Sequence, residues 1–277
     1  MVDSINTNTS SALNIQQLAK TKSQLNGTQN RISTGLKING PKDNAAIFQV
    51  SQILAGQAAG TSAVKSSLSS EESTVGVAVS AGQQVSDLLT DIKAKVVQAN
   101  QPGLDSASRQ AIDAEFQQLT QQLESVVAGA SFGGVNLLNS GASDFAVLSS
   151  ENGDTFNVGA QDLSLQGLGL DGLSLTSSGG AASALSAING AIDTASARVA
   201  DLGSSAQRIE EAATFTTRLD NILKEGVGNL IDADLGEEAA GLSAQSVKQE
   251  LGLRSLAIAN AGPKALLSLF PGGGGND

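Results

Sequence analysis

A heptad repeat between residues 61 and 99 constrains this chain more than any other feature of its sequence. Apolar or small residues recur there at alternate steps of three and four over more than five heptads. This spacing places them on one stripe of a long α-helix, which is stable only when other helices cover the stripe. The a positions are Thr61, Leu68, Val75, Gly82, Leu89 and Val96, and the d positions are Val64, Glu71, Ala78, Val85, Ile92 and Ala99. The sequence therefore predicts a helix that Asp43 or Asn44 caps and that continues to about Asn100.

Two more segments carry helical spacing and are expected to pack on this helix. One begins at a cap formed by Asp105 or Ser106, after the break at Gln101-Pro102-Gly103, and ends near Gly129. The other follows Gly180 and ends at the break Gly226-Val227-Gly228. Their stripes contain Ile112, Phe116, Leu119, Leu123 and Val126, and then Leu185, Ile188, Ile192, Ala195, Val199, Leu202, Ala206, Ile209, Ala213, Thr216 and Leu223. Together the three helices predict an antiparallel helical rod.

The glycine-rich segment 130–180 interrupts the helical pattern. The run FAVLSSENGDTFNV places an Asn-Gly turn between two stretches that alternate at period two, which predicts a β-hairpin. The later run DLSLQGLGLDGLSL alternates in the same way, and we also expect strands there. The predicted fold class is therefore mainly α, with a small segment that is rich in β-hairpins.

The two ends of the chain carry helices that cannot bury their apolar residues alone. Residues 5–38 place Ile15, Leu18, Leu25, Ile32 and Leu36 at a and d positions, where Lys22 and Gln29 interrupt the a positions. The last helix is predicted from near Ile231 and is apolar on more than one face. Its apolar residues are Leu235, Leu242, Val247, Leu251, Leu253, Leu256, Ile258, Leu266, Leu267, Leu269 and Phe270. We expect residues 5–38 and other copies of the protein to cover them.

The composition argues against an enzyme. The chain has no cysteine and no histidine, which excludes thiol nucleophiles, imidazole acid–base catalysis, disulfides and most zinc sites. The acidic residues lie singly or in the pairs Glu71-Glu72, Glu210-Glu211 and Glu237-Glu238, which we interpret as solvated helix faces. We therefore expect no catalytic residue, no metal site and no cofactor.

Charge and hydropathy argue against nucleic acid and membrane partners. The net charge is −11, and no basic patch with interleaved aromatic residues is present. No apolar run approaches the ~20 residues that span a bilayer. The first fifteen residues lack the basic and apolar regions of a signal peptide, so residue chemistry alone favours the cytoplasm unless export uses another route.

Motifs at both ends of the chain resemble those of the flagellin family. SINTNTSSAL and QNRISTGLKINGPKDNAAI near the start resemble the opening helix of the family and the turn that follows it. GVGNLIDADLGEEAAGLSAQSVKQELGLRSLAIANAGPKALLSLF resembles its closing helix, and the phrase GVGNLIDADL is most similar to flagellins of α-proteobacteria. The match covers roughly 45 residues at each end.

The resemblance implies an architecture. Residues 1–40 and 229–277 would form the two halves of a terminal coiled-coil domain that lines the central channel of a filament. Residues 41–130 and 181–228 would form the surrounding helical rod, and residues 131–180 a β-rich segment on the outside.

The resemblance also implies a function and partners. The chain would be exported unfolded through the flagellar type III apparatus, with the help of an export chaperone. Outside the cell it would form a helical homopolymer for swimming motility, alone or with sister flagellins, and would contact hook-associated and cap proteins. Two alternatives stay open at this point: a hook–filament junction protein, and a secreted coiled-coil binding module that acts as an adhesin or effector.

Two sets of residues are candidate binding sites. The expected polymerisation interface consists of Ile5, Leu18, Leu25, Ile32, Leu242, Leu251, Leu256, Ile258, Leu266, Leu269 and Phe270. The second set comes from the resemblance, because an innate-immune Toll-like receptor detects many flagellins through arginine, leucine and glutamate on the middle helices. Asp91, Ala94 and Lys95 stand at the matching positions, which implies weak or no detection of this chain.

Overall fold

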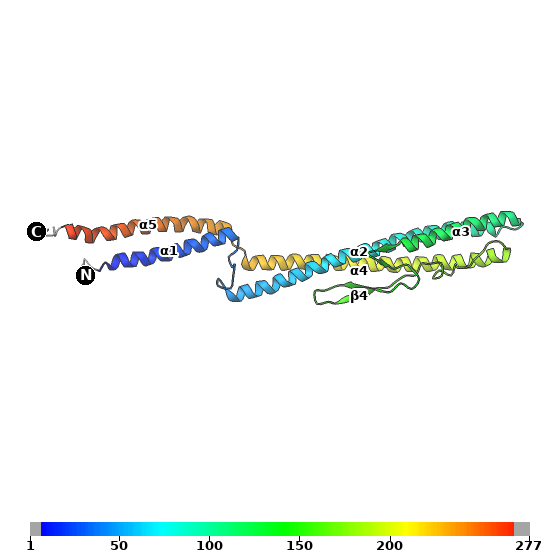
Figure 1. Cartoon of the computed structure of the whole chain (residues 1–277), viewed down its shortest axis with the longest axis horizontal. Helices are drawn as coiled ribbons and strands as arrows, with labels where there is room; N and C mark the ends of the chain where they lie inside the picture. Colours follow the sequence, from blue (N-terminus) through cyan, green and yellow to red (C-terminus); the bar gives the residue numbers. More distant parts are fainter. Residues whose placement is uncertain (1–6, 269–277) are drawn as a thin grey trace, which may run out of the picture. The chain divides into compact units, whose positions relative to one another are not determined.

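The computed structural model describes residues 7–268 of the chain. The chain divides into two compact units, one formed by residues 1–55 and 223–277 and the other by residues 56–222. The described part is mainly α-helical and contains two small antiparallel hairpins, which confirms the predicted fold class (Figure 1). No helix of this part is long and apolar enough to span a bilayer.

Helix α2 (Ala45–Ala99) confirms the heptad prediction. The side-chain oxygen of Asn44 accepts hydrogen bonds from the backbone N–H groups of Ala46 and Ile47, both at 3.1 Å, so Asn44 caps the helix. Every predicted a and d position from Thr61 to Ala99 is buried. The stripe is the central element of the core in the second unit.

Helices α3 (Ser106–Gly129) and α4 (Ser178–Ile231) complete this core. The carboxylate of Asp105 caps α3 by accepting hydrogen bonds from the backbone N–H and the hydroxyl of Ser108, and these bonds lower the pKa of Asp105. Side chains on the expected stripes of both helices are buried or half-buried, and Phe116 and Leu123 on α3 and Ile188 and Ile209 on α4 are among the buried ones.

Polar contacts and close packing align the three helices within the second unit (Figure 1). Lys95 Nζ on α2 lies 2.5 Å from Glu115 Oε2 on α3. The side-chain amide of Asn100, just after α2, donates to the carbonyl oxygen of Ala181 on α4 at 2.7 Å. Gly82 allows close approach, because a Cβ atom there would lie 2.8 Å from Val199 Cγ2. These contacts make α2 antiparallel to both neighbours, as predicted.

The predicted β-hairpin is present between α3 and α4. Strand β3 (Phe145–Leu148) pairs with β4 (Thr155–Val158) in antiparallel register, with Phe145 opposite Val158. A second, two-residue ladder joins β1 (Ser131–Phe132) and β2 (Val135–Asn136) around Gly133 and Gly134. The Asn-Gly signal therefore identified the main hairpin correctly.

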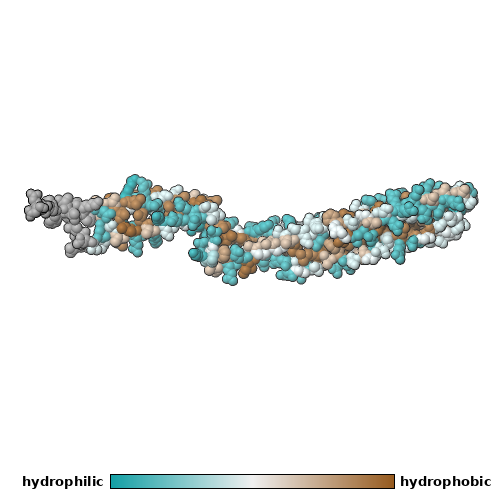
Figure 2. Space-filling model, in the orientation of Figure 1, coloured by the Kyte–Doolittle hydropathy of each residue, from teal (hydrophilic) through white to brown (hydrophobic). Residues whose placement is uncertain are grey.

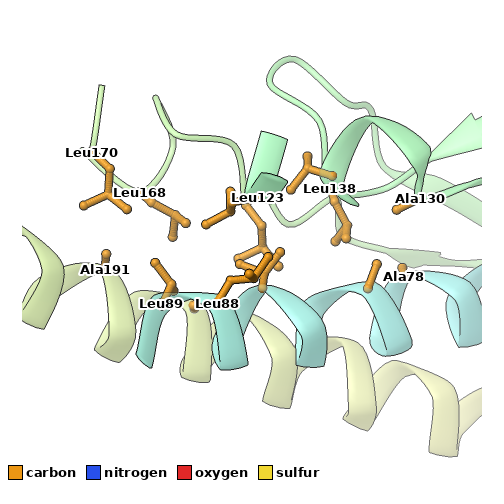
Figure 3. Close-up of a cluster of buried hydrophobic side chains, with 14 of the residues drawn as sticks. Ala78, Leu88, Leu89, Leu123, Ala130, Leu138, Leu168, Leu170 and Ala191 are labelled. Atoms are coloured by element: carbon orange, nitrogen blue, oxygen red, sulfur yellow. The ribbon is translucent and has the colours of Figure 1, made fainter. Parts of the chain in front are cut away.

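The prediction of strands in DLSLQGLGLDGLSL was wrong. Residues 162–175 form turns, and Gly169 and Gly172 adopt positive φ of 68° there. The alternating leucines serve the helical core instead, since Leu163, Leu168, Leu170 and Leu175 are buried. Figure 3 shows Leu168 and Leu170 pointing from this segment toward the helices.

The predicted break at Gly226-Val227-Gly228 was also wrong. Helix α4 continues through it to Ile231, and α5 (Leu235–Ser268) begins after the short link 232–234. Glycine inside a helix costs only about 1 kcal/mol relative to alanine, and packing readily offsets this cost. The true helix start is the Asp234 cap, whose side-chain oxygen accepts from the N–H groups of Gly236 and Glu237 at 2.8 and 3.1 Å.

Helix α1 (Thr9–Thr34) is shorter than the predicted helix over residues 5–38. The side chain of Asn8 caps its start by accepting from the backbone N–H of Ser11 at 2.9 Å. Gly35 ends it with a left-handed φ of 74°, and the Gly35 N–H donates to the Arg31 carbonyl oxygen. Residues 1–6 lie outside the described part.

The interpretation of all three acidic pairs as solvated faces was wrong in part. Glu72, Glu210, Glu211 and Glu237 are exposed, whereas Glu238 is half-buried and paired with Arg31. Glu71, however, occupies a buried d position, because the β-hairpin covers it. Its Oε1 accepts hydrogen bonds from the hydroxyl of Ser67 at 3.0 Å and from the backbone N–H of Leu148 at 3.3 Å.

We expect Glu71→Leu to free the hairpin without weakening the helices. The substitution removes the carboxylate that accepts the hydrogen bond from the Leu148 N–H, and it adds an apolar side chain to the α2 stripe. A hydrogen bond to a charged group contributes about 1.5–3 kcal/mol, so amide exchange at Leu148 should accelerate roughly tenfold or more. Hydrogen exchange measured by NMR tests this, with the exposed neighbour Glu72→Leu as the control. Unchanged exchange at Leu148 in Glu71→Leu would contradict the assignment.

Candidate polymerisation interface

Helices α1 and α5 lie side by side and antiparallel in the first unit (Figure 1). Polar contacts hold both ends of the pair. The side-chain amide of Asn8 donates to the carbonyl oxygen of Ala259 at 2.8 Å, and Arg31 Nε lies 2.6 Å from Glu238 Oε1. These two contacts fix which end of α1 meets which end of α5.

The turns beside the pair are joined as well. The carbonyl oxygen of Ile231 accepts from the N–H groups of Lys37 and Ile38 at 2.6 and 3.2 Å. The N–H of Ala233 donates to the carbonyl oxygen of Gly35 at 2.9 Å. The segment after α1 therefore forms a short backbone ladder with the segment before α5.

The α1 side of the seam differs from the predicted stripe. Its buried or half-buried positions alternate at steps of three and four: Ser11, Asn14, Leu18, Thr21, Leu25, Thr28 and Ile32. The predicted a positions Ile15, Lys22 and Gln29 are exposed. The prediction counted apolar residues only, whereas small hydroxyl side chains can be buried when they bond to their own helix, as Thr21 does to the Gln17 carbonyl oxygen at 3.0 Å.

The α5 side of the seam follows the same spacing. The half-buried positions that follow it are Glu238, Leu242, Gln245, Gln249, Gly252, Leu256 and Ala259, and Gly241 is half-buried beside them. Leu18 packs against Gly252, where a Cβ atom would lie 3.3 Å from Leu18 Cδ1.

The spacing extends this register along the whole seam. It places Leu25 opposite Gln245, Thr28 opposite Leu242 and Asn14 opposite Leu256, so each layer holds at most one large apolar side chain. The seam is consequently narrow, and it buries little apolar surface for its length.

Three large apolar side chains of α5 point away from α1. Val247, Leu251 and Ile258 lie on one helical face and are 56, 57 and 75% exposed. We call these three residues the outer face of α5. Leu13 and Ile15 on α1, and Leu235 and Leu253 on α5, are exposed too. Figure 2 shows hydrophobic residues on the visible surface of this helix pair.

The residues of the expected interface therefore occupy different environments. Leu251 and Ile258 are exposed. Five are half-buried in the seam: Leu18, Leu25, Ile32, Leu242 and Leu256. Ile5, Leu269 and Phe270 lie outside the described residues, as does the side chain of Leu266. The expected set omitted Leu13 on α1 and Val247 and Leu253 on α5. The two α5 residues could have been found by assigning the polar residues of α5 to the seam.

The positions matched to the immune-receptor patch lie on one stretch of α2. Asp91 and Ala94 are exposed. Lys95 is half-buried, and its ammonium group is paired with Glu115 of α3.

Comparisons with known proteins agree with this arrangement. Residues 5–143 match the bacterial flagellin N-terminal helical region, and residues 185–270 match the bacterial flagellin C-terminal helical region. Flagellin FljO of Caulobacter vibrioides is 39% identical over 97% of this chain and 99% of its own length. A flagellin of Brucella melitensis is 33% identical over 97% of this chain and 99% of its own length.

A solved structure shares the fold. The crystal structure of Bacillus cereus flagellin aligns with a TM-score of 0.50 at 20% identity, covering 54% of this chain and 88% of that one. Together with the paired terminal helices, the matches define a helical structural subunit of a filament. The chain belongs to the bacterial flagellin family. As a flagellin it is exported and forms part of the extracellular flagellar filament for motility.

We expect the size of residue 252 to control pairing of the terminal helices. Gly252→Ala should assemble normally, because only the mobile end of Leu18 must shift and the helix gains about 1 kcal/mol in propensity. Gly252→Leu should block assembly by forcing the helices apart. Seeded polymerisation followed by sedimentation measures both, and Gly241→Leu is the control because a Cβ at Gly241 meets open space. Normal filaments from Gly252→Leu would show that this close contact is dispensable.

Proposed function

We propose that the outer face of α5 is a subunit–subunit contact of the filament. The observation that supports this is the distribution of residues on α5. The helix turns glutamine, glycine and only two leucines toward α1, and it leaves Val247, Leu251 and Ile258 exposed. Fully burying one such side chain contributes roughly 1.5–3 kcal/mol. In an open, heterologous polymer, which never closes on itself, this gain recurs at every subunit.

The two rows of residues in the expected interface then have different roles. The seam residues, including Leu18, Leu25 and Leu256, hold α5 against α1 in the same subunit. The outer residues, including Leu251 and Ile258, contact other copies. We propose the same domain division that the sequence suggested. The terminal domain contains residues 1–40 and 229–277. The middle domain contains residues 41–130 and 181–228, and the β-rich segment contains residues 131–180.

Several partners belong to the same proposal. Self-association is central, and sister flagellins that carry similar terminal helices can share the filament. Hook-associated proteins, the cap protein and an export chaperone would bind the apolar terminal helices before or at the ends of assembly. A junction protein or a secreted binding module with similar ends would not form long filaments, so electron microscopy of the purified protein separates these alternatives.

We expect replacement of Val247, Leu251 and Ile258 together by serine to abolish filament growth. The three positions lie outside the core of the second unit, so its helicity and thermal unfolding should change little. Three losses of buried aliphatic surface, each of roughly 1.5–3 kcal/mol, would recur at every subunit. Seeded polymerisation with sedimentation gives the result, and circular dichroism checks folding.

A matched control separates the outer face from general polarity. Ala239, Ser243 and Ser246 are exposed residues of α5 outside the outer face. Replacing Ala239 by serine should leave growth normal. Normal filaments from the triple variant would rule out the outer face as a subunit contact.

We also expect the Asp91, Ala94 and Lys95 patch to bind the Toll-like receptor weakly. An acidic residue stands where a basic contact is expected, and Lys95 is held by Glu115, so charge complementarity is lost. A reporter-cell assay with pure protein should give weak or no activation. Asp91→Arg together with Ala94→Leu should raise activation if the patch is responsible, and strong activation by the unmodified protein would contradict the proposal.

A further inference from the structure

Hydropathy does not explain which face of α5 meets α1. The outer face carries Val247, Leu251 and Ile258, whereas the face in the seam places Gln245, Gln249 and Gly252 between Leu242 and Leu256. We call the seam side of α5, residues 238, 242, 245, 249, 252, 256 and 259, the inner face. Burial of apolar surface alone would not select the inner face, because both faces carry large aliphatic residues. Some other feature must select the inner face.

The contacts at the ends of the seam and in its middle supply part of this selection. Asn8 bonds to the Ala259 carbonyl oxygen, Arg31 pairs with Glu238, and Leu18 packs on Gly252. All three depend on the inner face being turned toward α1. These three contacts explain why the inner face packs on α1. They do not explain why the inner face carries glutamine at the positions between them.

Gln245 is the least favourable residue of the inner face. In the part of the chain that the structure describes, its Oε1 atom is buried without a hydrogen-bond partner. The register of the seam places Leu25 opposite it. Leaving a buried acceptor unpaired is unfavourable, whereas an apolar group of the same shape would be neutral or stabilising. Gln245 therefore does not stabilise the pairing of α1 with α5.

We propose that Gln245 is a specificity-determining residue of assembly, which keeps the inner face from binding other copies of the chain. A buried polar group in a helical seam penalises every pairing that lacks compensating contacts. The α1 helix of the same chain offers Asn8 and Arg31 as such contacts, and its high effective concentration favours it further. A helix of another copy that docks on the inner face in a different register lacks both advantages.

The consequence is that the two faces of α5 bind different partners. The inner face binds α1 of the same subunit, and the outer face is left for neighbouring subunits. This inference rests on the proposed use of the outer face in the filament. It adds that the choice of partner in assembly depends on an unfavourable residue, Gln245 on the inner face, as well as on the favourable residues of the outer face.

Gln245→Met tests the role, since methionine keeps the length of the side chain and removes the amide. We expect the free protein to associate without seeds at a concentration at least tenfold below that at which the wild-type protein does so. We also expect amide exchange in α1 and α5 to slow. Analytical ultracentrifugation and hydrogen exchange measure the two effects. Ser246→Met, on the exposed neighbour, should cause neither change.

A combined variant distinguishes this inference from the proposed function. Gln245→Met is placed in the chain whose Val247, Leu251 and Ile258 are serine. Unseeded association that survives there uses the inner face and supports the inference. Association lost in that background, association of Gln245→Met that equals the wild type, or faster exchange in its α1 and α5 would each overturn it. Filament growth by the serine triple variant alone would instead overturn the proposed function.

Discussion

The narrow seam between α1 and α5 is the interaction on which the arrangement of the chain ends depends. Gly252, Ala259 and the small hydroxyl residues of α1 let two helices pack closely with few large side chains between them. Because the seam needs little apolar surface, Val247, Leu251 and Ile258 of α5 stay on the opposite face. A pair built this way holds its geometry through polar end contacts and still exposes a surface that another subunit can cover.

The helices of the second unit are packed differently from the terminal pair, with many large apolar side chains between them. Its α2, α3 and α4 stripes are buried on one another, and four leucines of the irregular segment after the hairpin cover what the helices leave open. Gly82 and the hairpin contact at Glu71 adjust this packing locally. The second unit therefore buries most of its large apolar side chains, although Phe215 and Ile222 are exposed, whereas the terminal pair leaves Val247, Leu251 and Ile258 exposed. This contrast is the physical basis for assigning assembly to the chain ends.

Much of the fold follows from local patterns. The heptads of α2, the caps at Asn44 and Asp105, and the Asn-Gly hairpin could be predicted because each depends on residues near in sequence. The leucines of 163–175 were mistaken for strands, since alternation at period two does not say which surface the side chains meet. The glycines at 226 and 228 were mistaken for a break because the cost of glycine is small enough for packing to override.

By itself the sequence determined that the chain is a long-helix protein with uncovered apolar residues at both ends, and its terminal motifs indicated the family. Only the tertiary structure decided which residues of α1 and α5 face each other. The seam contains Thr21, Thr28 and Gln245, which a search for apolar stripes passes over, and excludes Ile15 and Leu251, which such a search selects. The reason is that helix pairing depends on size and hydrogen-bond complementarity across the seam, and these are properties of two segments that lie far apart in the chain.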